Sequence, residues 1–148
     1  IRTSNFPSHI SENIVKFLFC KKYNVMPTWD TKVGDLCINN DYCKPLKIEV
    51  KGSINLFNGP PTFGPKESWD IIYFVDGKDT FKKKYKIYEI KLSNISETWR
   101  NMKVNKNQTY QDQCLQNRRP RSTFKNILNQ IGCNNYSLVF DGHITELF

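Results

Sequence analysis

Apolar positions recur along this chain with two different periods, and each period predicts a different kind of element. Residues 11–24 (SENIVKFLFCKKYN) predict a helix, because their apolar side chains fall at helical spacing and Ser11 can cap the start. A Ser/Thr cap, a similar apolar face and the terminating Gly132 predict a second helix over 122–132, and a short one is expected over 96–102. The apolar positions of the first helix are Ile14, Val15, Leu18 and Phe19.

Four other segments have the composition and alternation of strands. VGDLCIN (33–39) and PLKIEVKGS (45–53) are separated by the turn NNDYC, which predicts a hairpin. WDIIYFVD (69–76) is almost entirely apolar, as expected for a central strand buried on both faces. YKIYEIKLS (85–93) alternates like a strand with one wetter face.

Glycine and proline mark the remaining connections. Residues 54–66 contain two glycines and three prolines and should form a long ordered loop, and YSLVF-DG-HITELF (136–148) predicts a hairpin around Asp141-Gly142. This order predicts an α/β (α+β) fold: a mixed central sheet of about four to five strands flanked by helices, plus a C-terminal hairpin. A length of 148 residues favours one domain over 1–148, and a start at Ile1 rather than Met leaves room for residues upstream.

Charge points to a polyanionic partner. The net charge is +8 and the pI is about 9.3. The longest apolar runs are too short to span a bilayer, so we expect no membrane association. Five cysteines, an odd count without a CxxC pair, predict a reducing, intracellular compartment and a cytoplasmic protein.

The basic side chains of residues 100–125 are interleaved with Asn, Gln, Thr and Tyr, which hydrogen-bond base edges and phosphates. Within it, residues 105–121 have few apolar side chains, so we expect little of this stretch to be deeply buried. It predicts contacts with double-stranded DNA, with arginine suited to guanine or phosphate and the amides suited to adenine. The candidates are Lys103, Asn105, Lys106, Asn107, Gln108, Thr109, Tyr110, Gln113, Arg118, Arg119 and Arg121. The loop at 54–66 is a second candidate, expected to follow the DNA backbone.

Candidate catalytic residues lie in the first predicted hairpin. Alternation places Glu49 and Lys51 on one face of their strand, and Asp35 in the preceding strand should lie near Glu49 across the turn. Two converging carboxylates form a hard-oxygen site for Mg²⁺, for which Mn²⁺ may substitute, beside which Lys51 can position an attacking water. Glu12, at the start of the first helix, is placed to add another carboxylate.

Acid-x-Lys triplets are common in a chain with this many lysines, so a rival set must be weighed. Glu89 and Lys91 also lie on a predicted strand and could pair with Asp76 or Asp79. Those two aspartates flank a glycine turn among lysines, which is typical of surface charges. The set of Asp35, Glu49 and Lys51 is therefore favoured.

The pattern Gly-Asp-Leu, a turn and Ile-Glu-Val-Lys-Gly-Ser resembles the catalytic core of the PD-(D/E)XK nuclease superfamily, with Gly34 where the motif has proline. The runs at 59–77 and 104–121 are similar to those of type II restriction endonucleases. The resemblance implies a Mg²⁺-dependent, sequence-specific endodeoxyribonuclease that cuts double-stranded DNA, with Asp35, Glu49 and the Val50 carbonyl as metal ligands. Ser53, which ends the motif, joins the DNA-binding candidates.

Two other functions remain open on the sequence. A DNA repair or junction-resolving nuclease of the same superfamily would share the catalytic residues and recognise DNA shape. A non-enzymatic nucleic-acid-binding protein would use the basic charge alone, but two acids close to a phosphate would repel it without a metal. A palindromic site is matched by two-fold protein symmetry, so a homodimer is expected, at least on DNA.

Overall fold

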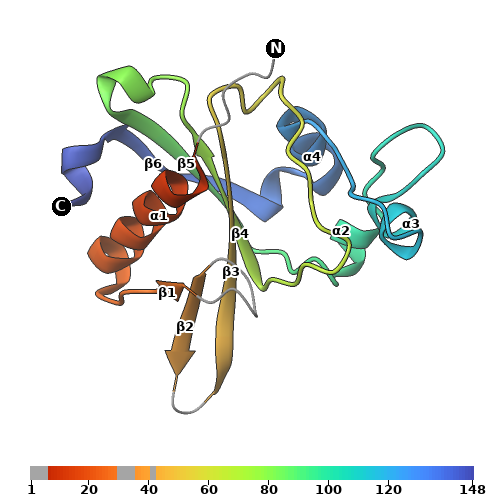
Figure 1. The fold of residues 1–148 in the computed structure, drawn as a ribbon, viewed down its shortest axis with the longest axis horizontal. Helices are drawn as coiled ribbons and strands as arrows, with labels where there is room; N and C mark the ends of the chain where they lie inside the picture. Colours follow the sequence, from red (N-terminus) through yellow and green to blue (C-terminus); the bar gives the residue numbers. More distant parts are fainter. Residues whose placement is uncertain (1–6, 30–35, 41–42) are drawn as a thin grey trace.

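A mixed β-sheet forms the centre of the molecule (Figure 1). The structure, a computed structural model, describes residues 7–29, 36–40 and 43–148. The described sheet has six strands in the order β1-β2-β3-β4-β5-β6; β3 and β4 run parallel, and the other neighbouring strands are antiparallel. The strands are β1 (Thr28–Trp29), β2 (Leu36–Asn40), β3 (Cys43–Ser53), β4 (Ile71–Asp76), β5 (Lys84–Ile90) and β6 (Tyr136–His143).

Helices cover both faces of this sheet. Helix α1 lies on one face, and α2, α3 and α4 lie on the other (Figure 1). The α-helices are α1 (Ser8–Tyr23), α2 (Glu97–Arg100), α3 (Tyr110–Leu115) and α4 (Phe124–Ile131). Three 3-10 helices, η1 (Thr80–Lys82), η2 (Cys133–Asn135) and η3 (Ile144–Leu147), complete the described elements.

Strand β4 divides the core into two halves, because its side chains alternate between the faces. Ile71, Tyr73 and Val75 pack with α1, whereas Ile72 and Phe74 pack with α4 and the aromatic residues around it. The prediction of a central strand buried on both faces is confirmed, as is the mixed sheet between helices.

The predicted helices are present, with shifts at their ends. Helix α4 begins after Thr123, whose hydroxyl accepts a hydrogen bond from the Asn126 N–H, and it ends at Gly132 with φ 84°. Helix α1 begins at Ser8, and the hydroxyl of Ser11, expected to be the cap, donates to the Ser8 carbonyl inside the helix. None of the described helices has the length and apolar character needed to cross a membrane.

The expected C-terminal hairpin is not formed. Asp141 and Gly142 lie within the continuous strand β6, opposite Lys86 and Tyr85 of β5, and the chain then enters η3. The two-residue turn signal is overridden because β5 offers a partner along the full length of β6. With β1 and β6 included, the sheet has six described strands rather than four to five.

Candidate active site

Strand β3 brings Glu49 and Lys51 together on the face of the sheet away from α1. Their neighbours Ile48 and Val50 point to the α1 side and are buried there, so period-two alternation directs Glu49 and Lys51 to the opposite side. Glu49 is only 4% exposed, and its Oε1 atom lies 3.8 Å from Nζ of Lys51. The predicted placement of this acid and this lysine on one face is confirmed.

A second carboxylate, which the sequence did not single out, also approaches Lys51. Oε2 of Glu67 lies 3.4 Å from Nζ of Lys51, closer than the Glu49 oxygen. The ammonium also lies 5.2 Å from the centre of the Phe63 ring, a favourable cation–π arrangement. Glu67 and Phe63 belong to the connection between β3 and β4, so no strand or helix period could have indicated that they return to Lys51.

The structure gives less on the two other predicted catalytic acids, Asp35 and Glu12. Asp35 lies outside the described residues; it directly precedes Leu36, which pairs with Ile48, the residue before Glu49. Glu12 is half-buried on α1, the helix that packs against the opposite face of the sheet from Glu49.

The donors at this site are those that a hard cation prefers. A buried carboxylate is costly unless a cation or hydrogen-bond donors balance it, and Mg²⁺ prefers such oxygens. No group of three His, Cys, Asp or Glu side chains that could hold a metal occurs within residues 7–29, 36–40 and 43–148, a range that omits Asp35. Glu49 and the backbone carbonyl of Val50 thus fit Mg²⁺ in chemical type, and Asp35 would supply the second carboxylate.

The fold separates Glu89 from Asp76, two members of the rival carboxylate set. Glu89 is buried on the α1 side, where its Oε2 accepts a 2.6 Å hydrogen bond from the hydroxyl of Tyr73. Asp76 lies opposite Lys86, toward the other end of β5, and its side chain accepts from the Lys78 N–H in a turn. Glu89 therefore has a structural partner and does not meet this aspartate.

Several amides predicted to read bases are engaged within the protein. The Asn105 side-chain oxygen accepts hydrogen bonds from the N–H groups of Asn107 and Gln108. Oε1 of Gln108 accepts from the side-chain amides of Asn105 and Gln113, and the Arg118 guanidinium lies at 3.4 Å from the same oxygen. This network shapes the turn before α3 and leaves Gln108 few free hydrogen-bonding positions.

Two further candidates lie in the interior. Tyr110 packs against Trp99 and Phe63, and Gln113 is also buried, so the expectation that this segment stays exposed fails at both residues. Thr109 caps α3 by accepting from the Asp112 N–H, while the Asp112 carboxylate accepts from the Thr109 N–H. This capping box was visible in the sequence as Thr-x-x-Asp and could have predicted the short helix.

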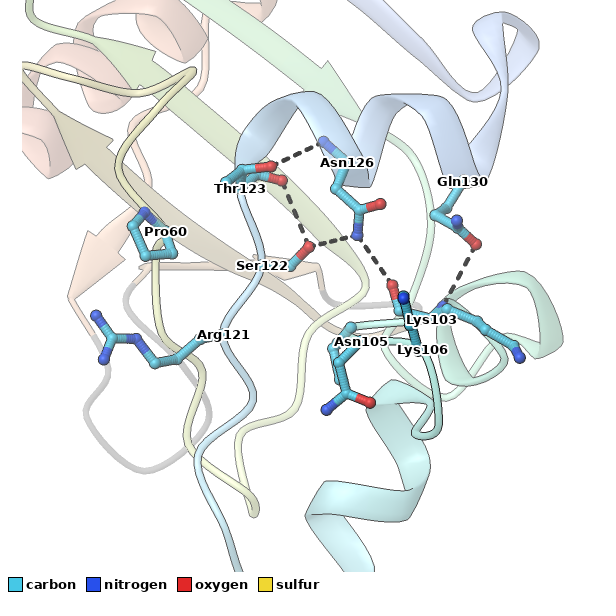
Figure 2. A pocket seen from close by; sticks show the side chains of 10 residues that line it. Pro60, Lys103, Asn105, Lys106, Arg121, Ser122, Thr123, Asn126 and Gln130 are labelled. Atoms are coloured by element: carbon cyan, nitrogen blue, oxygen red, sulfur yellow. Dashed lines mark hydrogen bonds between the residues drawn. The ribbon is translucent and has the colours of Figure 1, made fainter.

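Three of the basic candidates line an open pocket of about 480 Å³ at the start of α4 (Figure 2). Figure 2 shows Arg121 on one side and Lys103 and Lys106 on the other, with Asn126 between. The Asn126 amide donates to the Lys103 carbonyl at 2.9 Å and to the Ser122 hydroxyl at 2.7 Å, which fixes the two walls relative to each other. The lining residues contain three cations and no acid: Pro60, Lys103, Val104, Asn105, Lys106, Arg121, Ser122, Thr123, Asn126 and Gln130.

The loop at 54–66 joins this pocket to the residues around Lys51. Thr62 forms an isolated β-bridge with Arg121, and the Phe63 N–H donates to the Pro120 carbonyl at 3.0 Å. Pro60 therefore lies at the pocket while Phe63, three residues later, lies beneath the Lys51 ammonium. The cationic pocket and the Glu49–Lys51 pair share one connecting segment.

Ser53 and Arg119 complete the predicted set. Ser53 ends β3 two residues beyond Lys51, and its hydroxyl accepts from the Asn55 N–H at 2.9 Å. Arg119 is exposed, with its guanidinium 3.5 Å from the Thr62 hydroxyl.

Comparison with known proteins identifies a family for this chain. The comparisons with curated proteins and with solved structures each found no match. The family model described as Bsp6I restriction endonuclease matches residues 1–130, a range that includes β3, the connection after it and the cationic pocket. The chain therefore belongs to the Bsp6I restriction endonuclease family.

Proposed function

We propose that this protein is a Mg²⁺-dependent type II restriction enzyme with a PD-(D/E)XK active site, which hydrolyses phosphodiester bonds of double-stranded DNA at a specific sequence. The observation that carries the proposal is the buried carboxylate of Glu49 beside the ammonium of Lys51 on one face of β3. A DNA-binding protein without catalysis has no use for an acid buried where a phosphate would approach. Membership of a restriction endonuclease family supplies the substrate class.

We propose separate roles in metal binding and in orienting the attacking water. Asp35, Glu49 and the Val50 carbonyl would hold the metal, and Mg²⁺ supplies charge neutralisation at the phosphate and activation of water. Lys51 carries its charge on the side of Glu49 away from the α1 core, where it can orient the attacking water and offset charge on the phosphoryl oxygens. Glu12 is proposed as an accessory acid of smaller effect, because α1 covers the other face.

We assign DNA contacts to the exposed cations around the pocket. Lys103, Lys106 and Arg121 carry three positive charges at a surface lined by no acid, which suits phosphates of the DNA backbone. Arg118 and Arg119 are exposed on the adjoining segment and are the side chains best suited to guanine edges. We assign a structural role to Gln108 and Gln113, because their side-chain amides form hydrogen bonds within the protein.

Cleavage of plasmid DNA tests the proposal. With Mg²⁺ or Mn²⁺ the protein should give discrete bands, and it should give none with excess chelator or with Ca²⁺, a larger ion with looser coordination. Asp35→Asn and Glu49→Gln should each abolish cutting, and Lys51→Ala should leave only residual cutting, while DNA binding survives in all three variants. The matched control is Glu89→Gln, which removes a buried acid but keeps an acceptor for the Tyr73 hydroxyl.

The possible results separate the competing functions. A smear or cutting confined to branched DNA would favour a repair or junction-resolving nuclease, and no cutting at all would leave only a binding protein. If Glu89→Gln were inactive and Glu49→Gln still cut, the catalytic assignment would be wrong.

We further propose that the enzyme acts on DNA as a homodimer. Two copies related by a two-fold axis place one active site on each strand of a palindromic site, which yields a double-strand break. Sedimentation of the Glu49→Gln variant with a cognate duplex should show two chains per duplex. A complex that stays at one chain at saturating protein would contradict the dimer.

A further inference from the structure

The ammonium of Lys51 has three described neighbours, and the nearest charged one is not Glu49. Its Nζ atom lies 3.4 Å from Oε2 of Glu67, 3.8 Å from Oε1 of Glu49 and 5.2 Å from the centre of the Phe63 ring. The Lys51 side chain is 18% exposed, so it cannot satisfy its charge from solvent alone. One lysine therefore balances two carboxylates that come from different parts of the chain.

The Glu67 carboxylate is aimed into this cluster rather than into solvent. Its Oε2 atom is buried and has no hydrogen-bond donor within the described part of the chain, although the whole side chain is 27% exposed. A buried carboxylate oxygen left without a partner is costly, so the Lys51 charge is what makes this position tolerable.

The backbone around Glu67 is held from both sides. The Glu67 carbonyl accepts a 2.6 Å hydrogen bond from the buried Asn94 amide, and the Asn94 oxygen accepts from the Trp69 N–H at 3.1 Å. The Glu67 N–H donates to the Gly64 carbonyl at 3.2 Å. The main chain at Glu67 is thus held in place, and its side chain extends from this fixed backbone to the Lys51 ammonium.

Gly64 leaves the space that the carboxylate occupies. A Cβ atom at this glycine would lie 3.0 Å from both Cγ and Oε1 of Glu67, a distance tighter than nine in ten real contacts. A larger residue at this position would therefore require the Glu67 side chain to shift by a few tenths of an ångström. Gly64 and Asn94 thus help to place the Glu67 carboxylate beside the Lys51 ammonium.

We propose that Glu67 is a positioning residue that holds the Lys51 ammonium in place for the reaction, an inference that rests on the proposed nuclease function. A lysine side chain has four flexible carbons and gains a defined position only from what surrounds it. A metal held by Glu49 would offset part of the charge of that carboxylate, and Glu67 would remain as the carboxylate that keeps Lys51 aligned. Glu67 itself binds neither the metal nor the phosphate.

The test begins with Glu67→Gln, which keeps the shape of the side chain and removes its charge. Under single-turnover conditions with Mg²⁺, the cleavage rate should fall about tenfold or more while the affinity for cognate DNA changes less than about threefold. Glu67→Asp, which keeps the charge, should recover part of the rate. The exposed acid in α2 provides the matched control, so Glu97→Gln should cut at the original rate.

A double-mutant cycle shows whether Glu67 acts through Lys51. In a Lys51→Ala background, assayed at high enzyme concentration for residual cutting, Glu67→Gln should have almost no further effect. A full additional loss in that background would overturn the proposal. Calorimetric titration of Mg²⁺ should give the same affinity for Glu67→Gln as for the original chain, and a loss of affinity would make Glu67 a metal ligand and also overturn it.

A readout without activity tests the pair independently of the nuclease assignment. In metal-free protein, an amine-reactive reagent should modify Lys51 several-fold faster in Glu67→Gln than in Glu97→Gln, with mass spectrometry locating the product. Equal rates would overturn the positioning role even if the protein cuts DNA. If the original chain cuts no DNA but Lys51 is still labelled faster in Glu67→Gln, the proposed function is wrong and the contact between Glu67 and Lys51 is supported.

Discussion

At the scale of single residues, the face of a strand decides what an acid does. Glu49 and Glu89 share an acid-x-Lys pattern and nearly the same burial, but they point to opposite sides of the sheet. Glu89 meets the Tyr73 hydroxyl and is satisfied as a structural acid. Glu49 meets Lys51 and, through it, Glu67. The sequence could predict which acids lie on strands, but the choice between them follows from what covers each face.

The Tyr73–Glu89 pair predicts how stability depends on pH. Burial, followed by the hydrogen bond and charge of Glu89, raises the pKa of Tyr73 well above its ordinary value. The folded state therefore keeps a proton that the unfolded chain loses above about pH 10. Stability from this group is complete below that pH and falls as the pH rises further, by about 1.4 kcal/mol per pH unit.

In chemical denaturation, Tyr73→Phe should change both the free energy of unfolding and its dependence on pH. The free energy of unfolding at pH 7 should fall by roughly 1–3 kcal/mol, because a buried carboxylate loses a donor. Between pH 10 and 11 the free energy of unfolding should also fall less steeply with pH, because unfolding then releases about one proton fewer. Tyr110, whose pKa burial also raises, should contribute a similar alkaline slope in the same variant. An unchanged slope in Tyr73→Phe would show that this hydroxyl does not control it.

At the scale of elements, local signals predicted most of the fold and tertiary pairing corrected the rest. The caps of α2 and α4 and the apolar strand β4 are all visible in the sequence. Asp141-Gly142 carries a turn signal, but pairing with β5 keeps it extended. The site divides in the same way: alternation places Glu49 and Lys51 together, whereas Glu67 arrives through loop contacts that have no period.

The polar network before α3 gives a prediction at this scale. Gln108 links Asn105, Gln113 and Gln116 through its side-chain amide, so it should hold the turn in shape. Gln108→Ala should lower the free energy of unfolding by about 1–2 kcal/mol, because buried partners such as the Gln113 amide lose their acceptor. The exposed neighbour provides the control, and Asn107→Ala should change stability by less than about 0.5 kcal/mol.

Thermal unfolding and mismatch binding together check this assignment. The Gln108→Ala variant should melt earlier yet keep its preference among single-mismatch duplexes. A variant of unchanged stability that lost discrimination at one base pair would instead identify Gln108 as a base reader.

At the scale of the whole molecule, the positions of the positive charges say more about DNA binding than the net charge does. Many of the lysines lie around η1 and β5, whereas the acid-free group of three cations lies at the pocket beside α4. Contacts of the loop at 54–66 join that pocket to Phe63 beneath Lys51. DNA bound at the pocket, as proposed, would be coupled through a short segment to the residues proposed for cutting.

This arrangement predicts which cations set the salt dependence of DNA binding. Each phosphate contact that is lost should reduce the slope of log affinity against log salt by about 0.9. Lys103→Ala, Lys106→Ala and Arg121→Ala should each do so, and they should weaken cognate and non-cognate duplexes alike. Lys82→Ala, an equal loss of charge in η1, should leave the slope unchanged because η1 lies at the turn between β4 and β5.

Fluorescence anisotropy in the Glu49→Gln background, at several salt concentrations and without cutting, can measure all four slopes. The comparison is informative because the net charge falls by one in every variant, so a general field effect predicts four equal changes. A shallower slope in the three pocket variants and not in Lys82→Ala would locate the DNA at the pocket. Four equal slopes would mean that the pocket has no special part in DNA binding.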